Sequence, residues 1–322
     1  MTVTQGQPIV EIKNLCKYFD LGHGAKLHAV DDVSLTIYKG ETLGLVGESG
    51  CGKSTLGRVL VRMYDQTSGT YSFDGKSVPA KLSFAQRKSF SRQAQMIFQD
   101  PYQSLNPRMT VGDIISEGPS IHGEWQGNDR KNEIMNWLNR VGLVPEHAMR
   151  FPHEFSGGQR QRIGIARSLA LNPRFVVCDE PISALDVSVQ AQVVTLLQDL
   201  QRELGLTYLF IAHSLSMVRY ISTRMAVMYL GKVVELGPSE DLYRNPLHPY
   251  SEALIAANPF PDPKKERERE HKLLGGEITS PVNPKPGCRF ANRCPIATDK
   301  CRSENPVLKE SQPGRFVACH YR

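Results

Sequence analysis

The chain has 322 residues, of which 40% are hydrophobic and 22% are charged, and its formal net charge is +6. This length accommodates one large α/β domain plus a smaller appendage, and the composition is that of an ordinary soluble globular protein. No apolar run approaches the roughly 18–20 residues of a membrane-spanning helix, and the start, MTVTQGQPIV, lacks the layout of a secretory signal. We therefore expect a cytoplasmic protein, and the mild, dispersed charge argues against nucleic acid as its main partner.

The first third of the chain predicts strands that lead into a glycine-rich loop. Residues 8–15 and 30–37 alternate between apolar and polar in the manner of half-buried strands. A short apolar strand at 41–47 then runs directly into the sequence GESGCGKST, and a helix is expected to begin near Lys53. The order strand, glycine loop, helix is that of a phosphate-binding loop.

The remaining chain predicts a helical insert and then a return to alternating strands and helices. Residues 102–155 are rich in Asn, Pro, Glu and Trp with helical patches, which indicates a mostly helical insert. Apolar strands and helices alternate after it and favour a largely parallel sheet covered on both faces. These predicted segments are 175–179, 189–204, 207–213, 225–230 and 232–236. A charged stretch at 262–270 is predicted to be a solvated linker or exposed helix.

The glycine loop is the first candidate site, because it matches the pattern GxxxxGK[ST]. Its glycines let backbone N–H groups curl around an anion, and the following helix adds partial positive charge. Lys53 would place a full charge on the β- and γ-phosphates, Ser54 would ligate Mg²⁺, and Thr55 would reach the α-phosphate. The predicted nucleotide-binding residues here are Gly47, Glu48, Ser49, Gly50, Cys51, Gly52, Lys53, Ser54 and Thr55. A chance glycine-rich turn is the alternative.

Two acidic residues follow the apolar strand in FVVCDE. Ligands of an open α/β sheet bind at the carboxyl ends of its strands, which is where Asp179 and Glu180 fall. Asp179 would hold the metal ion through a water, and Glu180 would orient or deprotonate an attacking water. Two ordinary surface acids are the alternative reading of this pair.

The stretch FSGGQRQR predicts a second anion site. Ser156 can cap a helix that begins near Gly157, and the two glycines leave its N–H groups accessible to a phosphate. One nucleotide does not need two such sites in one chain. A simple resolution is that the second site serves a nucleotide held by another subunit.

With these motifs in order, the chain resembles the ABC ATPase family over about residues 8–258. The resemblance rests on GESGCGKST, Gln99 in IFQDP, FSGGQ, VVCDE, SALD and His213 in IAHS. It implies a RecA-like sheet with an antiparallel β subdomain, a helical subdomain at about 102–170, and a cassette spanning 1–258. In this family two subunits pair head to tail, and each ATP lies between one glycine loop and the partner's signature sequence.

The resemblance also implies roles for individual residues. Gln99 and His213 would join Lys53 and Glu180 as the catalytic set, with Gln99 sensing Mg²⁺ beside Ser54 and Asp179. Phe19, or less readily Tyr18, would stack on adenine, and Asp186 would help communicate across the dimer. The signature residues that would contact nucleotide in trans are Ser156, Gly157, Gly158 and Gln159. Each has a plain alternative, such as a loop-capping glutamine or a histidine at a strand end.

The tail, about residues 240–322, is similar to the C-terminal extension of oligopeptide/dipeptide permease ATPases. This implies a bacterial or archaeal importer, peripheral on the cytoplasmic face of the plasma membrane and fed by an extracytoplasmic peptide-binding protein. The segment FQDPYQSLNPRMTV resembles that of the second, F-type, of the two ATPase subunits in such importers. This implies that the first, D-type, ATPase subunit is its partner and that the pair serves two integral membrane permease subunits. Related importers of nickel, glutathione or antimicrobial peptides remain alternatives for the substrate.

Four of the seven cysteines gather in the extension at 259–322, with loose spacing and without paired C-x-x-C knuckles. Such a set suits a [4Fe–4S] cluster, and the resemblance implies the same; structural zinc, and free or disulfide-bonded thiols, are the alternatives. The four are Cys288, Cys294, Cys301 and Cys319.

The sequence therefore predicts an ATP- and Mg²⁺-dependent subunit that energises import of di- or oligopeptides. A non-transport ATPase acting on nucleic acid or ribosomes is the alternative of a different class. A metal-binding sensor with a vestigial glycine loop is a third, and the intact Lys53, Glu180 and His213 argue against it.

Overall fold

The structure, a computed structural model, describes residues 6–257 and 279–322, so the predicted linker at 262–270 lies outside the described residues. The chain divides into two compact units. The first contains Met1–Val59, Tyr64–Lys81 and Phe210–Arg322, and the second contains Leu60–Met63 and Leu82–Leu209. In the described part of the chain, no helix is both long enough and apolar enough to cross a membrane.

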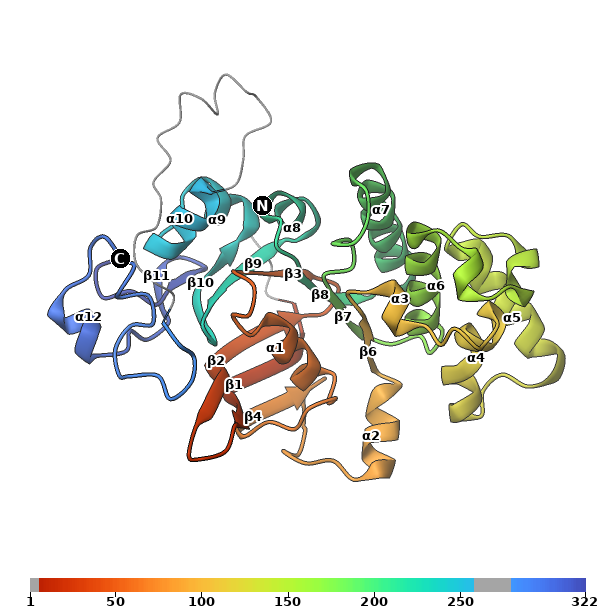
Figure 1. Ribbon diagram of the computed structural model, residues 1–322, viewed down its shortest axis with the longest axis horizontal. Helices are drawn as coiled ribbons and strands as arrows, with labels where there is room; N and C mark the ends of the chain where they lie inside the picture. Colours follow the sequence, from red (N-terminus) through yellow and green to blue (C-terminus); the bar gives the residue numbers. More distant parts are fainter. Residues whose placement is uncertain (1–5, 258–278) are drawn as a thin grey trace, which may run out of the picture. The chain divides into compact units, whose positions relative to one another are not determined.

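The first unit carries an antiparallel sheet in the order β2-β1-β4-β5 (Figure 1). Its strands are β1 (Pro8–Asp20), β2 (Lys26–Tyr38), β4 (Ser68–Phe73) and β5 (Lys76–Ser77). The two predicted strands form β1 and β2, and both extend beyond their predicted ends. Register shifts between Ile12, Leu15 and Lys17 interrupt the alternation of β1 without ending its pairing to β2, which is why the apolar pattern stops early.

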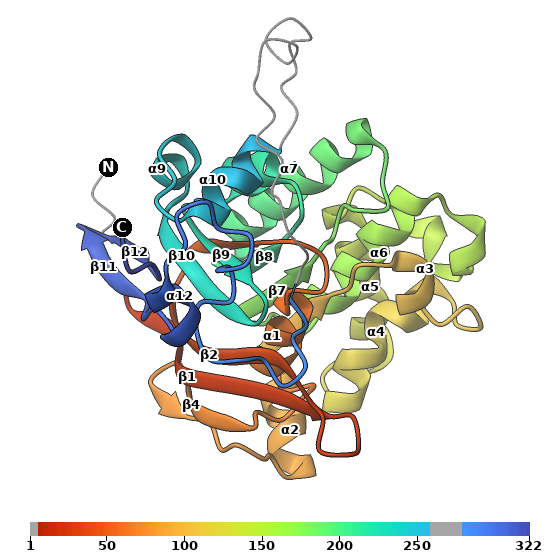
Figure 2. The same ribbon diagram turned by 60° about the vertical axis from the view of Figure 1, so that its left-hand side comes forward.

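The same unit holds a run of strands in the order β11-β12-β10-β9-β3. They are β3 (Thr42–Val46), β9 (Arg224–Tyr229), β10 (Lys232–Pro238), β11 (Lys309–Gln312) and β12 (Arg315–Val317). β3 pairs with β9 in parallel, whereas β10, β12 and β11 continue antiparallel, so the chain's last strands extend this sheet (Figure 2). All five residues of β3 are buried.

The described part of the first unit also contains short helices. They are α1 (Lys53–Leu60), α8 (Leu215–Ile221), α9 (Ser239–Arg244), α10 (Pro249–Ala256) and α12 (Asp299–Ser303). α8 approaches β3 so closely that a Cβ on Gly44 would lie 2.1 Å from Cγ1 of Val218. The glycine in TLGLV therefore serves helix–strand packing.

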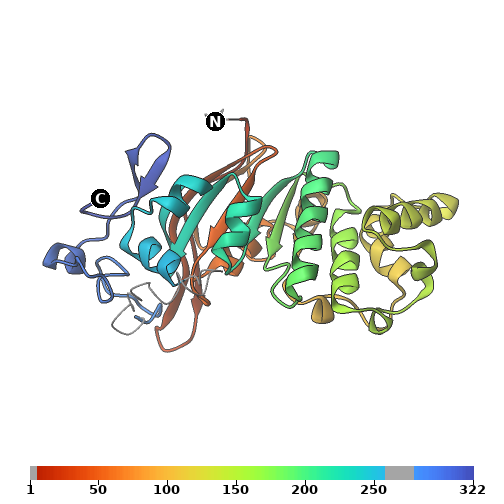
Figure 3. The same cartoon turned by 90° about the horizontal axis from the view of Figure 1, so that it is seen from above.

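The second unit combines strands with the predicted helical insert. β6 (Ala94–Ile97) runs parallel to β7 (Phe175–Asp179), and the boundary between the units falls within β8 (Thr207–Ile211). α6 and α7 lie side by side (Figure 3). The helices are α2 (Phe84–Ser91), α3 (Pro101–Ser104), α4 (Val111–His122), α5 (Gly127–Arg140), α6 (Gly157–Leu169) and α7 (Val187–Leu204), with 3₁₀ turns η1 (Pro145–Met149) and η2 (Pro152–Glu154). The mostly helical character predicted for 102–155 is confirmed.

Candidate functional site

The glycine loop connects β3 to α1 in a conformation that only glycine accommodates at two positions. A Cβ on Gly47 would lie 2.1 Å from the carbonyl oxygen of Met228, and one on Gly52, at φ +108°, would lie 2.0 Å from that of Ala29. Gly50 also has a left-handed backbone, at φ +74°, but faces open space. The loop thus rests against neighbouring backbone on one side, while its tip is open.

Lys53 lies at the centre of this loop, with only 4% of its surface exposed. Its Nζ donates to the carbonyl oxygens of Gly47 at 2.8 Å and Glu48 at 2.9 Å. A buried ammonium held by its own loop is a ready counter-charge for phosphate. Burial raises the pKa of the neighbouring Cys51 thiol, although Lys53 opposes this, so Cys51 acts as a small protonated filler of the loop.

Two aromatic residues near the end of β1 differ in how they are engaged. Tyr18 donates its hydroxyl to Asp31 at 2.5 Å and stacks on His28, and burial together with the Asp31 bond raises its pKa. Phe19 is partly exposed; its ring meets the Tyr64 ring edge-on at 5.5 Å, and Nζ of Lys17 lies 4.8 Å from its centroid. Phe19 is therefore the better candidate for stacking on a base. His213, also in this unit, is exposed just after β8.

In the second unit, the parallel strands β6 and β7 bring two predicted residues together. Asp179 ends β7 and is 1% exposed, and Glu180 follows it at 6% exposed. Glu180 has φ +47°, and its Oε2 accepts a hydrogen bond from Nε2 of Gln99 at 2.7 Å. A left-handed backbone at a non-glycine residue is uncommon and is found at sites where a side chain must be aimed.

The signature stretch begins α6 as the sequence predicts, with Ser156 as its N-cap. The N–H of Gln159 donates to Oγ of Ser156 at 3.4 Å, and the N–H of Ser156 donates to Oε1 of Gln159 at 3.0 Å. A Cβ on Gly158 would lie 2.6 Å from Cγ1 of Val189 on α7. Asp186 caps α7 from an exposed position without a side-chain bond to its N–H groups.

All four tail cysteines line one small cavity of about 10 Å³, together with His248 and Phe290. All four are free thiols. Burial, together with the neighbouring thiols, raises the pKa of Cys288 to about 11, although a hydrogen bond from the backbone N–H of Phe290 lowers it in part. The donor type fits a metal or cluster, but the space is about that of one water molecule. Within 6–257 and 279–322, no three His, Cys, Asp or Glu side chains stand at metal-binding geometry. The predicted [4Fe–4S] cluster thus finds no support in the geometry.

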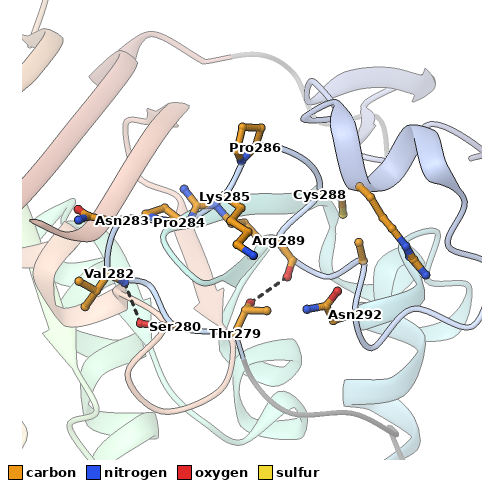
Figure 4. Close-up of a pocket in the computed structure, with 12 residues that line it drawn as sticks. Thr279, Ser280, Val282, Asn283, Pro284, Lys285, Pro286, Cys288, Arg289 and Asn292 are labelled. Atoms are coloured by element: carbon orange, nitrogen blue, oxygen red, sulfur yellow. Dashed lines mark hydrogen bonds between the residues drawn. The ribbon is translucent and has the colours of Figure 1, made fainter. Parts of the chain in front are cut away.

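The segment before these cysteines curls around a pocket of about 470 Å³ (Figure 4). Thr279 donates its hydroxyl to the carbonyl oxygen of Arg289, and the N–H of Val282 donates to the hydroxyl of Ser280. The Arg289 guanidinium forms an ion pair with Asp31 of β2. This segment is therefore fastened to the unit that carries the glycine loop.

One contact of the glycine loop was not predicted from the sequence. Arg293, next to Cys294 in the chain, forms an ion pair with Glu48 at 3.0 Å. Burial alone would lower the pKa of Arg293, but hydrogen bonds to Glu48 and Tyr229 outweigh it and hold the pKa above its usual value. No pattern in the sequence could reveal this contact, because the partners lie 245 residues apart.

The amino-acid sequence matches two known families of protein domains. The family model described as ABC transporter matches residues 30–183, and the model described as oligopeptide/dipeptide transporter, C-terminal region, matches residues 234–301. The putative oligopeptide transport ATP-binding protein YkfD of Bacillus subtilis (strain 168) is 57% identical over 314 residues, covering 97% of this chain and 95% of the relative. The chain belongs to the ABC transporter ATP-binding proteins.

One further relative and one solved structure agree with this membership. The oligopeptide transport ATP-binding protein OppF of the same B. subtilis strain is 56% identical over 290 residues, covering 87% of this chain and 95% of the relative. A solved dimeric ATP-binding cassette in a post-hydrolysis state, bound to ADP and Pi, is 27% identical with a TM-score of 0.65, covering 72% of this chain and 99% of that one. The predicted ABC ATPase fold, its ATPase activity and its use of ATP and Mg²⁺ are thereby confirmed, and the transporter match favours transport over a nucleic-acid factor.

Proposed function

We propose that this ABC ATPase hydrolyses ATP to energise a membrane importer of di- or oligopeptides. The relatives named as oligopeptide transport proteins and the match to the transporter C-terminal region support this substrate class. The observation that carries the hydrolytic step is the pairing of Glu180 with Gln99 at the carboxyl ends of two parallel strands.

The residues of the glycine loop bind the nucleotide in this proposal. Backbone N–H groups from Gly47 to Thr55 surround the phosphates, and Lys53 turns from its loop carbonyls to the β- and γ-phosphates. Ser54, Asp179 and Gln99 would hold Mg²⁺, which would offset the charge of the phosphates. Phe19 stacks on adenine.

Hydrolysis then requires a base and contacts to the γ-phosphate. Glu180 accepts the proton of the attacking water, while Gln99 fixes the orientation of the Glu180 carboxylate. His213 contacts the γ-phosphate from the same chain as the glycine loop. Residues 156–159 contact the nucleotide held by the other subunit, in keeping with the dimeric state of the solved cassette. Each ATP thus joins two subunits, and its hydrolysis releases them.

The substitution Glu180→Gln tests the hydrolytic step. It removes the base but keeps a side chain of the same size, so turnover should fall by at least about 100-fold while ATP stays bound. The measurement is phosphate release by the purified transporter together with nucleotide retained after desalting. Glu203→Gln on the exposed end of α7 is the matched control and should turn over normally. Undiminished turnover of Glu180→Gln would overturn the role of Glu180.

The proposed partners are a second, D-type ATPase subunit and two integral membrane permease subunits, with an extracytoplasmic peptide-binding protein acting indirectly. The chain is then peripheral on the cytoplasmic face of the plasma membrane of a bacterium or archaeon. Uptake assays with di- and oligopeptides, nickel, glutathione and antimicrobial peptides separate the substrates. Uptake of di- and oligopeptides, and no uptake of nickel or glutathione, supports the peptide assignment. Uptake of nickel or glutathione without uptake of di- or oligopeptides contradicts it.

The four cysteines are proposed to hold a [4Fe–4S] cluster that fastens the tail, a role that thiolates at loose spacing suit. The thiols that line the cavity must move apart to admit it. Anaerobic purification followed by iron, sulfide and zinc assays tests this. About four iron and four sulfide per chain are expected, whereas one zinc, or no metal, contradicts the cluster.

A further inference from the structure

The second residue of the glycine loop is held by groups from the C-terminal part of the chain. Nη1 of Arg293 lies 3.1 Å from Oε1 and 3.0 Å from Oε2 of Glu48. The side chains of Arg293 and Glu48 are 10% and 28% exposed, so the pair is largely shielded from solvent. Such a charge-assisted contact is stronger than an exposed ion pair.

The backbone of Glu48 is held as well. Its N–H donates to the hydroxyl of Tyr250 at 2.8 Å, and Tyr250 is fully buried against Tyr229 and Phe290. The carbonyl oxygen of Glu48 accepts from Nζ of Lys53 at 2.9 Å. Every polar group of Glu48 is therefore engaged, and one of its partners is the lysine that is proposed to bind phosphate.

The charge of Glu48 gives the ion pair a consequence for nucleotide binding. A carboxylate beside a bound polyphosphate repels it, and in a shielded position the repulsion is strong unless a cation compensates. Arg293 supplies that cation. It also fixes the residue whose carbonyl oxygen positions Lys53.

We propose that Arg293 is a positioning residue for the ATP site: from the cysteine-bearing tail it neutralises Glu48 and holds the glycine loop ready for the phosphates. This inference rests on the proposed function, because it presumes that the loop binds ATP. It makes the tail part of the nucleotide site and not only an appendage to it. Arg293 acts on affinity through Glu48, so its loss changes binding of ATP and not the rate of the hydrolytic step.

The test measures the Kd of a fluorescent ATP analogue for the full chain and the KM and kcat of the purified transporter. Arg293→Gln should raise Kd and KM by about tenfold, with kcat within about twofold of wild type. The double variant Arg293→Gln/Glu48→Gln removes both charges together and should recover to within about threefold of wild-type affinity. A purely structural role for Arg293 predicts no such recovery.

Arg289→Gln is the matched control, because Arg289 is equally buried, lies four residues earlier and pairs with Asp31 instead of the loop. It should destabilise the chain as Arg293→Gln does, measured by thermal unfolding, yet leave Kd within about twofold of wild type. Unchanged affinity in Arg293→Gln, or a double variant as weak as the single one, would overturn the inference. Failure of the wild-type chain to bind the analogue would instead overturn the proposed function.

Discussion

The chain contains two helix N-termini proposed to bind phosphate, and they are built in different ways. The loop at 47–55 is shaped by neighbouring backbone that only glycine can meet, and it encloses a buried lysine. At the start of α6, by contrast, Ser156 and Gln159 satisfy each other's backbone N–H groups, so this helix end is stable without a ligand. The first is a preformed cradle, whereas the second is a stable helix end that gains a phosphate only when one is brought to it.

The difference indicates that the glycine loop supplies the affinity for ATP, whereas the start of α6 sets when the nucleotide is released. A preformed cradle loses little freedom on binding and can hold ATP in a single chain. A capped helix end needs no ligand to be stable, so it can release its partner's nucleotide after hydrolysis. Substitutions in the glycine loop and at the start of α6 test this division.

Substituting a glycine that rests against backbone should weaken ATP binding the most. A Cβ at Gly52 would meet a backbone oxygen at 2.0 Å, so Gly52→Ala should weaken ATP binding by more than about 100-fold. Gly50→Ala, in open space, adds only the strain of a left-handed alanine, about 1 kcal/mol, and should cost less than about tenfold. Titration with a fluorescent ATP analogue measures both. Equal losses would mean that backbone strain, not contact, shapes the loop.

Altering the helix end should impair turnover without touching binding by the isolated chain. A Cβ on Gly158 would lie 2.6 Å from Cγ1 of Val189 and would displace the start of α6, whose N–H groups are proposed to bind phosphate, so Gly158→Ala should lower turnover of the transporter by about 10- to 100-fold. Gly164→Ala, in the same helix with no atom within 4 Å, is the control. If Gly158→Ala weakened ATP binding by the isolated chain, the glycine loop and the start of α6 would not act as separate binding sites.

The capping box of α6 has a counterpart that separates stability from function. Ser83 caps α2 with Gln86 as Ser156 caps α6 with Gln159. Each Ser→Ala substitution should cost about 1 kcal/mol of stability, measured by urea unfolding. Only Ser156→Ala should also reduce turnover, by about fivefold, because its hydroxyl is proposed to contact the nucleotide. Equal turnover in the two variants would confine Ser156 to capping.

The last prediction concerns stability at acid pH behind the glycine loop. Burial lowers the pKa of His248 to about 3, and its unprotonated Nδ1 accepts the N–H of Tyr250, which in turn holds Glu48. The folded pKa lies below the ordinary value of 6.5, so the contribution to stability is complete above pH 6.5 and falls as the pH drops toward 3.

His248→Asn keeps an acceptor without the titrating ring. It should therefore reduce the loss of unfolding free energy below pH 6.5 by up to about 1.4 kcal/mol per pH unit. Urea unfolding at several pH values measures the slope, with the exposed His23→Gln as the control. An unchanged slope for His248→Asn would show that His248 does not set the acid stability of this region.

Local patterns predicted most of the architecture. The helix at Gly157, the strand β7 and the glycine loop follow from capping chemistry, apolar runs and motif spacing, all of which act over a few residues. The strand β11 gave no signal, because its four residues are all exposed and polar. Its place depends on pairing with β12, which no local pattern encodes.

The candidate site divides in the same way. Motif chemistry predicted Lys53 and Glu180, the family resemblance implied Gln99, and the structure brings Glu180 and Gln99 into contact. The hold of Tyr250 and Arg293 on Glu48 could not be predicted, because it depends on how the tail folds back over the loop. The backbone of Glu180, left-handed despite its side chain, was equally invisible in the sequence.

In the proposed mechanism, the glycine loop of one subunit and residues 156–159 of the other close on the same nucleotide. The most direct measurement is native mass spectrometry of the Glu180→Gln chain, extracted from membranes in mild detergent with its partners and supplied with ATP. We expect one complex that contains this chain, a second ATPase and two polytopic membrane proteins, with ATP retained between the ATPases. If the chain carried ATP without any partner subunit, or co-purified with nucleic acid and not with membrane proteins, the proposed mechanism would be contradicted.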